Sequence, residues 1–236
     1  MVVIFYSFNV FLDRINIINK NKISIKQVEM TKHLYITSIT GPDVQNGPGL
    51  RLTIWVQGCS HNCPGCQNMQ THHYVTNEYE NKYDYIQCYE EADGGDLILN
   101  PILKDILRTK LLQKDTDGNY VYDGVTFSGG DPLSQSPSAI QELEYLINYI
   151  IYQIRDEENS LNIWLFTGYK FEWIEQIDYL NDFIHNAPID VIVDGPFIER
   201  LKPTDKNTLK YRGSTNQRLI DVLATLVNNK IILYDE

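Results

Sequence analysis

Three of the chain's four cysteines fall within one eight-residue segment, and their spacing could do chemistry. Cys59, Cys63 and Cys66 form a C-x3-C-x2-C arrangement, while Cys88 stands apart and is interpreted as uninvolved. Cysteine thiolates hold iron–sulfur clusters, normally with one thiolate on each iron. Three thiolates on one short loop can hold three corners of a four-iron cube and leave the fourth iron open to another ligand. The spacing therefore predicts a [4Fe-4S] site with one open coordination position.

Other readings of the cysteines stay open when the segment is taken alone. A structural zinc site would join the three thiolates to His61, His72 or His73, because thiolate ligands suit zinc as well as iron. A redox pair of Cys63 and Cys66 would leave Cys59 unexplained. Three buried thiols without a role would be a poor fit to a polar, glycine-containing loop.

A second segment, which we call the glycine loop, is Ser128-Gly129-Gly130-Asp131-Pro132. It has the pattern of a strand end followed by a turn that contains two glycines. Two glycines would let a ligand approach the main-chain carbonyls closely. Carbonyls and the Asp131 carboxylate are acceptors, so they suit an ammonium group better than a phosphate. The loop fits an amino-acid-like ligand such as the methionyl part of S-adenosylmethionine, although an ordinary strand-to-helix turn has the same composition.

These motifs follow segments with the pattern of strands, and probable helices separate the later strands. Alternation of this kind predicts an α/β fold with a mostly parallel sheet, whose functional loops gather at the carboxyl ends of the strands. The strands are too few for a closed eightfold barrel, so we expect an open, partial barrel. The expected strands are 33–39, 50–56, 121–127, 162–166 and 189–193, and the expected helices are 97–112, 136–154 and 171–184.

The bulk composition indicates one soluble globular domain. The chain has 236 residues and a formal net charge of -11, without a basic run, so we expect no nucleic-acid partner. The apolar N-terminal stretch is short and interrupted by Ser7 and Asn9, which argues against a membrane span or signal peptide. We expect residues 1–30 to be an extension and residues 31–236 to be one domain with a surface insertion at about 76–96. Clustered cysteines indicate a reduced compartment, hence a cytoplasmic protein.

Six motifs occur together in one order. They are NGPG (46–49), the cysteine segment with its CPGCQN tail, SGGDPL (128–133), TGYK (167–170), VDGPFIERLK (193–202) and RGSTNQR (212–218). In this order the chain closely resembles the radical-SAM activating proteins of anaerobic (class III) ribonucleoside-triphosphate reductases. The resemblance implies the partial, open (β/α) barrel of the radical-SAM type. Most radical-SAM enzymes have an aromatic residue just before the third cysteine, whereas this chain has Gly65. In this respect the chain resembles the activase subfamily more than the wider superfamily.

The resemblance also implies particular site residues. It assigns a [4Fe-4S] cluster to Cys59, Cys63 and Cys66, with the open iron bound by the amino and carboxylate groups of S-adenosylmethionine. No side chain need act as acid or base, because the cofactor carries the difficult chemistry. The cofactor-binding residues expected from the matching motifs are Gly65, Gln67, Ser128, Gly129, Gly130, Asp131, Thr167 and Gly168.

The implied activity is reductive cleavage of S-adenosylmethionine to install a glycyl radical on the anaerobic reductase. Flavodoxin or a thiol system is the expected electron donor. One alternative is the activase of another glycyl-radical enzyme, such as pyruvate formate-lyase. The alternative from a different class is a zinc-binding module without catalysis.

Overall fold

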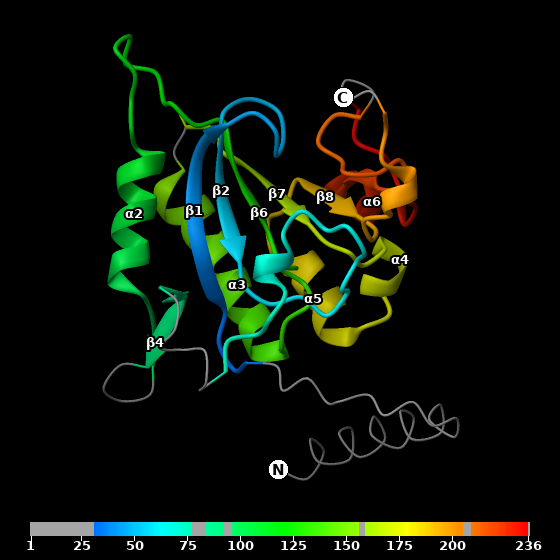
Figure 1. Cartoon of the computed structure of the whole chain (residues 1–236). Coiled ribbons are helices and arrows are strands. Elements are labelled where there is room, and N and C mark those ends of the chain that lie inside the picture. Colours follow the sequence, from blue (N-terminus) through cyan, green and yellow to red (C-terminus); the bar gives the residue numbers. More distant parts are fainter. Residues whose placement is uncertain (1–30, 77–83, 92–95, 156–158, 205–208, 236) are drawn as a thin grey trace.

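The computed structural model describes residues 31–76, 84–91, 96–155, 159–204 and 209–235 (Figure 1). A seven-stranded sheet runs through the centre in the order β3-β1-β2-β6-β7-β8-β9, and β4 and β5 form a separate two-stranded ladder. The strands are β1 (Tyr35–Asp43), β2 (Arg51–Val56), β3 (Ile86–Gln87), β4 (Tyr89–Glu91), β5 (Leu97–Leu99), β6 (Gly124–Gly129), β7 (Asn162–Phe166), β8 (Val191–Asp194) and β9 (Arg218–Asp221).

The four central strands confirm the expected α/β fold with a mostly parallel sheet. β2, β6, β7 and β8 pair in parallel, whereas β1, β3 and β9 pair antiparallel at the two sides. Within the described residues, β3 and β9 are the two ends of the strand order, so the sheet is open and not a closed barrel. All four parallel strands therefore present their carboxyl ends at the same edge, where the sequence motifs were expected to meet.

Helices cover one face of this sheet. The helical elements are η1 (Met69–Thr71), α2 (Pro101–Leu111), α3 (Pro137–Tyr149), the π-helical turn η2 (Ile150–Ile154), α4 (Phe171–Ile174), α5 (Asp178–Asn186), η3 (Glu199–Leu201) and α6 (Val222–Asn228). Figure 1 shows α3 and α5 behind the sheet, and these two helices contact each other. None of the helices in the described ranges has the length and apolar character needed to cross a membrane.

The starts of α2 and α3 follow capping rules, and that of α2 corrects an expected boundary. The Ser136 side chain accepts a hydrogen bond from Ala139 N, and Pro137 is the first residue of α3, as the sequence indicated. The predicted helix 97–112 is wrong in its first turn, because residues 97–99 form β5. Asn100 then caps α2 by accepting from Ile102 N. A residue that precedes proline is disfavoured in helical conformation, so the helix begins only at Pro101.

Two further differences lie in the second half of the chain. The single predicted helix 171–184 is two helices, because Ile177 has an extended backbone (φ -108°, ψ 107°) between α4 and α5. This break lets both Ile174 and Leu180 remain fully buried. β9 and α6 were not predicted, and Asp221 caps α6 by accepting from Ala224 N at 2.8 Å.

The two faces of the sheet have different chemistry. Leu52 and Ile54 of β2 and Phe127 of β6 point into the large apolar core beneath the helices. The intervening residues Arg51 and Thr126 are equally buried but polar, and they lie on the opposite face. Alternation along β2 and β6 thus gives one apolar face and one face with internal hydrogen bonds, and on β7 and β8 this second face carries a smaller apolar cluster of Trp164, Val191 and Val193.

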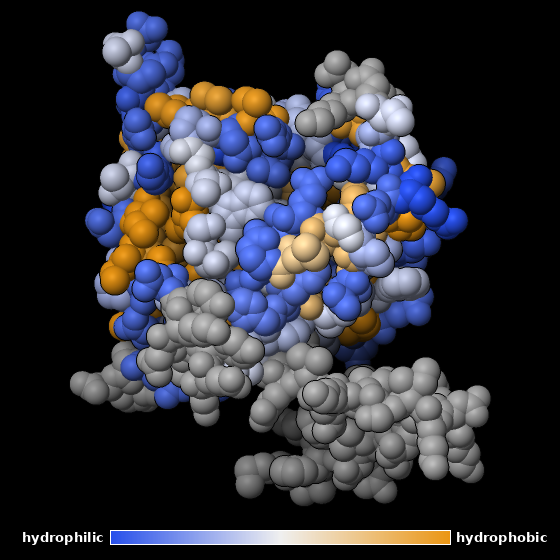
Figure 2. Space-filling model, viewed as in Figure 1, coloured by the Kyte–Doolittle hydropathy of each residue, from blue (hydrophilic) through white to orange (hydrophobic). Residues whose placement is uncertain are grey.

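The N-terminal extension (1–30) lies outside the described residues, so the proposed division at residue 30 stays a prediction. Within the expected insertion, β3 pairs with β1, and Cys88 is fully buried in the core. Cys88 N also donates to Leu34 O at 2.8 Å. Figure 2 shows apolar surface gathered on the side of α2, where Ile102 is 64% exposed, whereas much of the central face is polar.

Candidate metal centre

The three predicted ligands are all in one loop, residues 58–72, which follows β2 and which we call the cysteine loop. Cys59, Cys63 and Cys66 are free thiols, and each is partly exposed. Burial raises the pKa of the Cys59 thiol to about 12 and also raises the pKa of Cys63. The backbone amide of Asn68 donates to Cys66 Sγ at 3.4 Å. Amide hydrogen bonds to sulfur are typical of iron–sulfur sites, so the donor set fits such a cluster.

Backbone hydrogen bonds close the cysteine loop. Gly58 N donates to Thr71 O at 2.8 Å, and Cys59 N donates to His72 O at 2.9 Å. Farther along, Cys66 N donates to Cys63 O at 3.1 Å and forms a tight turn. The loop is therefore folded back on itself while its thiols stay partly exposed.

The glycine loop packs directly against the cysteine loop. Gly130 N donates to Val56 O at 2.8 Å, and Asp131 N donates to Gly58 O at 2.9 Å. A Cβ at Gly130 would lie 2.4 Å from Gly58 O, and a Cβ at Gly129 would lie 2.6 Å from Val56 O. The glycines are therefore required by the neighbouring main chain, and not only by the approach of a ligand that the sequence suggested.

Buried polar side chains that the sequence analysis missed hold the two loops together. Ser134 Oγ accepts from Ser60 N at 3.1 Å and lies 2.9 Å from the Tyr74 hydroxyl. Gln135 Nε2 donates to Gly58 O at 3.0 Å. Ser134 and Gln135 directly follow the SGGDPL motif, so their position was the only signal in the sequence.

The Asp131 carboxylate is buried and joins several strand ends. Its Oδ1 accepts from Leu133 N at 2.8 Å. Its Oδ2 accepts from Gly168 N at 2.8 Å and from Thr167 Oγ1 at 3.1 Å, and it lies 2.7 Å from His61 Nε2. Both oxygens therefore have protein partners, whereas the sequence analysis assigned Asp131 to the ammonium group of a ligand.

The other predicted site residues lie at the same edge of the sheet. Ser128 is 8% exposed at the end of β6, whereas Gln67 is on the surface of the cysteine loop. Gly65 faces η3, because a Cβ there would lie 2.7 Å from the carboxyl carbon of Glu199. The cysteine loop, the glycine loop and residues 167–168 thus form one region, joined through Asp131.

Two of the three histidines that could complete a zinc site are engaged elsewhere. His61 Nε2 faces the Asp131 carboxylate, and His73 Nε2 lies 2.6 Å from the Tyr85 hydroxyl. Across the described ranges, no group of three or more His, Cys, Asp or Glu side chains, the three cysteines included, is arranged to hold a single metal ion. In a [4Fe-4S] cluster each thiolate binds a different iron, so the three thiols need not converge on one point.

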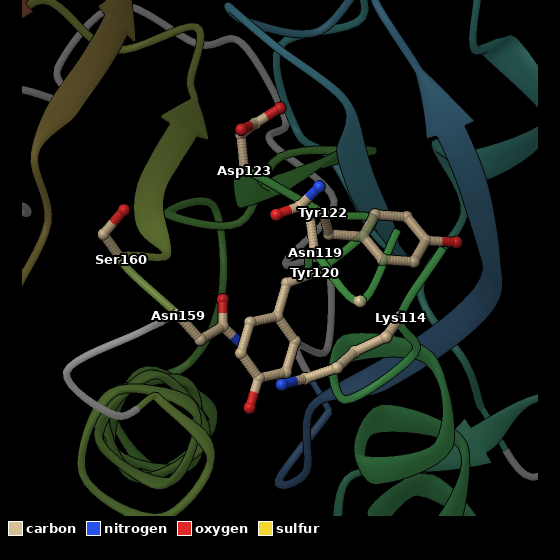
Figure 3. A pocket seen from close by; sticks show the side chains of 8 residues that line it. Lys114, Asn119, Tyr120, Tyr122, Asp123, Asn159 and Ser160 are labelled. Atoms are coloured by element: carbon tan, nitrogen blue, oxygen red, sulfur yellow. The ribbon is translucent and has the colours of Figure 1, made fainter. Parts of the chain in front are cut away.

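A separate cavity of about 370 Å³ lies near the amino ends of β6 and β7, away from the cysteine loop (Figure 3). Its lining includes Asp123 and Asn159, and Lys114 Nζ lies 4.4 Å from the centre of the Tyr120 ring. It contains none of the predicted site residues.

Comparison with known proteins places this arrangement in a family. Residues 45–220 match the family described as a 4Fe-4S single cluster domain. The chain is 33% identical to the anaerobic ribonucleoside-triphosphate reductase-activating protein of Enterobacteria phage T4, over 75% of this chain and 87% of that protein. It is 32% identical to the protein of the same name from Vibrio cholerae serotype O1 and 30% identical to that from Escherichia coli K12, each over 74% of this chain and 90% of the relative. The chain therefore belongs to the family of anaerobic ribonucleoside-triphosphate reductase-activating proteins and carries a 4Fe-4S single cluster domain.

Proposed function

We propose that this chain is an activase that cleaves S-adenosylmethionine reductively at a [4Fe-4S] cluster and generates a glycyl radical on the anaerobic ribonucleoside-triphosphate reductase. The observation that carries the proposal is a loop of three free thiols at the carboxyl end of a parallel strand, in a member of this family. The engaged His61 and His73 rings count against a zinc module completed by either of them.

The cluster would be held by Cys59, Cys63 and Cys66. When bound, the cluster would supply the one-electron reduction that cleaves S-adenosylmethionine, and removal of hydrogen from a glycine α-carbon of the partner would follow from that cleavage. The chain's own contribution is binding, orientation and exclusion of water. An open partial barrel of the radical-SAM type is the fold that we propose for this chemistry.

The S-adenosylmethionine site is proposed at the edge where the two loops meet. Main-chain carbonyls of the glycine loop (Ser128, Gly129, Gly130) would accept from the ammonium group, since carbonyls are acceptors only. Gly65, Gln67, Thr167 and Gly168 would line the rest of the cofactor site. Asp131 would contribute by orientation, because both of its oxygens are occupied by protein donors.

The partner and the location follow from the same proposal. The relatives are named for activating the anaerobic reductase, and we assign that reductase as the partner of this chain. A flavodoxin or a thiol system as electron donor stays a prediction, as does the cytoplasmic location. The net charge of -11 supports the absence of a nucleic-acid partner.

The test is to mix the reconstituted chain anaerobically with the reductase, S-adenosylmethionine and a reductant. We expect a glycyl radical in the electron paramagnetic resonance spectrum and about four irons and four sulfides per activase chain. Cys63→Ala should give no radical and lose the cluster. Cys88→Ala is the matched control, since it removes a thiol outside the cysteine loop, and it should retain both.

Two outcomes would contradict the proposal in different ways. A radical on pyruvate formate-lyase but not on the reductase would show that the partner is wrong while the chemistry is right. A colourless protein that contains zinc after anaerobic purification would remove the cluster and everything that depends on it.

A further inference from the structure

His61 lies within the cysteine loop, between the first two cluster cysteines, and its ring points to the interior. Its Nε2 lies 2.7 Å from Asp131 Oδ2, and the two side chains are 18% and 2% exposed. The ring nitrogen does not meet hydrogen-bond geometry with that oxygen, so the contact is a close approach of imidazole and carboxylate. Burial alone would lower the pKa of His61, but the Asp131 carboxylate outweighs this effect and raises it.

Residues 167–169 form the other side of the space that the His61 ring occupies. A Cβ at Gly168 would lie only 2.5 Å from His61 Cδ2. The Tyr169 ring packs edge-on against the imidazole, with centroids 4.7 Å apart and planes at 75°. The side chain is thus fixed by its contacts with Asp131, Gly168 and Tyr169, and its place depends on the absence of a side chain at Gly168.

The same Asp131 oxygen that faces His61 also accepts from Gly168 N and Thr167 Oγ1. The carboxylate therefore connects the cysteine loop, the glycine loop and the chain that follows β7. These contacts of Asp131 favour cluster binding by a loop that must present three thiolates. Ligands that are already oriented by neighbouring residues need no reordering when the metal binds.

We propose that His61 is a positioning residue that holds the cysteine loop in the cluster-binding conformation through Asp131 and the space over Gly168. The inference rests on the proposed function, since it assumes the cluster. His61 contacts neither the cofactor nor the substrate in this role. Its loss should weaken retention of the cluster and leave the fold of the chain without cluster intact.

The test measures release of iron to a chelator from anaerobically reconstituted protein. Loss of an outer-shell contact typically lowers metal affinity by 10–100-fold, so we expect His61→Ala to release iron about tenfold faster than wild type. Gly168→Ala should have a similar effect, because its new methyl group displaces the ring. In the double variant, Gly168→Ala should add nothing, since the ring that it displaces is already absent. The thermal midpoint of the chain without cluster should stay unchanged for His61→Ala.

His185→Ala is the matched control, because it removes an exposed imidazole of α5 that bonds only the local carbonyl of Asn181. The inference is overturned if His61→Ala releases iron at the wild-type rate, or if the two single effects multiply in the double variant. It is also overturned if His61→Ala lowers the thermal midpoint of the chain without cluster, since the role would then be structural. A wild-type chain that takes up no iron would instead refute the proposed function.

Discussion

The two ends of the same parallel strands are built for different purposes. At the amino end of β2, the Arg51 guanidinium is fully buried. Its Nε donates to Thr126 Oγ1 at 2.9 Å, its Nη2 donates to Val125 O at 2.7 Å, and its Nη1 donates to Asn162 Oδ1. Burial lowers the pKa of Arg51 to about 10, which still leaves it charged at neutral pH. At this end one cation is bonded across three strands.

At the carboxyl end, polar contacts join loops and not only strands. Ser134, Gln135 and Asp131 connect the cysteine loop to its neighbours, while the three cluster thiols stay partly exposed. Both networks are buried, but the one around Arg51 joins strands and stabilises the fold, whereas the one around Asp131, Ser134 and Gln135 positions a loop whose thiols stay accessible. Mutations at the amino end of the strands should therefore lower stability without affecting cluster binding, whereas mutations at the carboxyl end should affect cluster binding.

The largest effect on stability is expected at the amino end. Arg51→Met keeps much of the side-chain volume but leaves Val125 O and Asn162 Oδ1 without their donor. Each unsatisfied buried acceptor costs about 1–3 kcal/mol, so we expect a loss of about 3 kcal/mol in the free energy of unfolding. Denaturant titration of the chain without cluster measures this loss.

Arg108→Met is the control for the change of residue type, since Arg108 is exposed on α2 and should change stability by less than about 0.5 kcal/mol. The reconstituted Arg51→Met chain should release iron at the wild-type rate under conditions where it is folded. Accelerated release by Arg51→Met would show that the two ends are coupled and that the comparison fails.

A smaller effect on stability is expected at the carboxyl end. Ser134→Ala removes a fully buried hydroxyl that accepts from Ser60 N. We expect a loss of about 1 kcal/mol in the free energy of unfolding, because Tyr74 retains its bond to Ser134 O. Iron release should accelerate, in contrast to Arg51→Met. Ser160→Ala is the control, at an exposed position outside both loops, and should change neither stability nor iron release. If Ser134→Ala released iron at the wild-type rate, the contact between Ser134 and Ser60 would not contribute to retention of the cluster.

Local patterns predicted the central parallel strands, because such patterns depend on neighbours in sequence. The strand 162–166 was confirmed with the same bounds as β7, and the start of α3 followed from Ser136 and Pro137. These features are set by alternation and capping, which a single sequence displays. The cysteine segment does follow the end of β2, whereas the glycine loop begins within β6 and the RGSTNQR motif (212–218) leads into β9.

Long-range contacts could not be predicted in the same way. Nothing near His61 in the sequence indicates that its ring would contact Asp131 or pack against Gly168. β9 was missed because it is held as a strand by antiparallel pairing with β8, which is distant in sequence. Sequence periodicity reports which face is buried, but it does not report which residues meet across elements.

The smallest effect is expected where the carboxyl end of β8 meets solvent. Arg218 binds Glu172 there at 2.8 and 2.7 Å, and this hydrogen bond lowers the pKa of Glu172 to about 2. A lowered carboxyl pKa stabilises the fold above the unfolded value of about 4.5 and loses that contribution as the pH falls toward 2. Glu172 is 47% exposed, so solvent screening limits the contribution to less than about 1 kcal/mol at neutral pH.

Glu172→Gln should therefore lose little stability at pH 7 and should remove part of the acid dependence below pH 4.5, measured by unfolding at several pH values. Glu175→Gln, with the same change outside this ion pair, is the control; equal acid dependence in both variants would show that the pair with Arg218 adds nothing to the stability of this end.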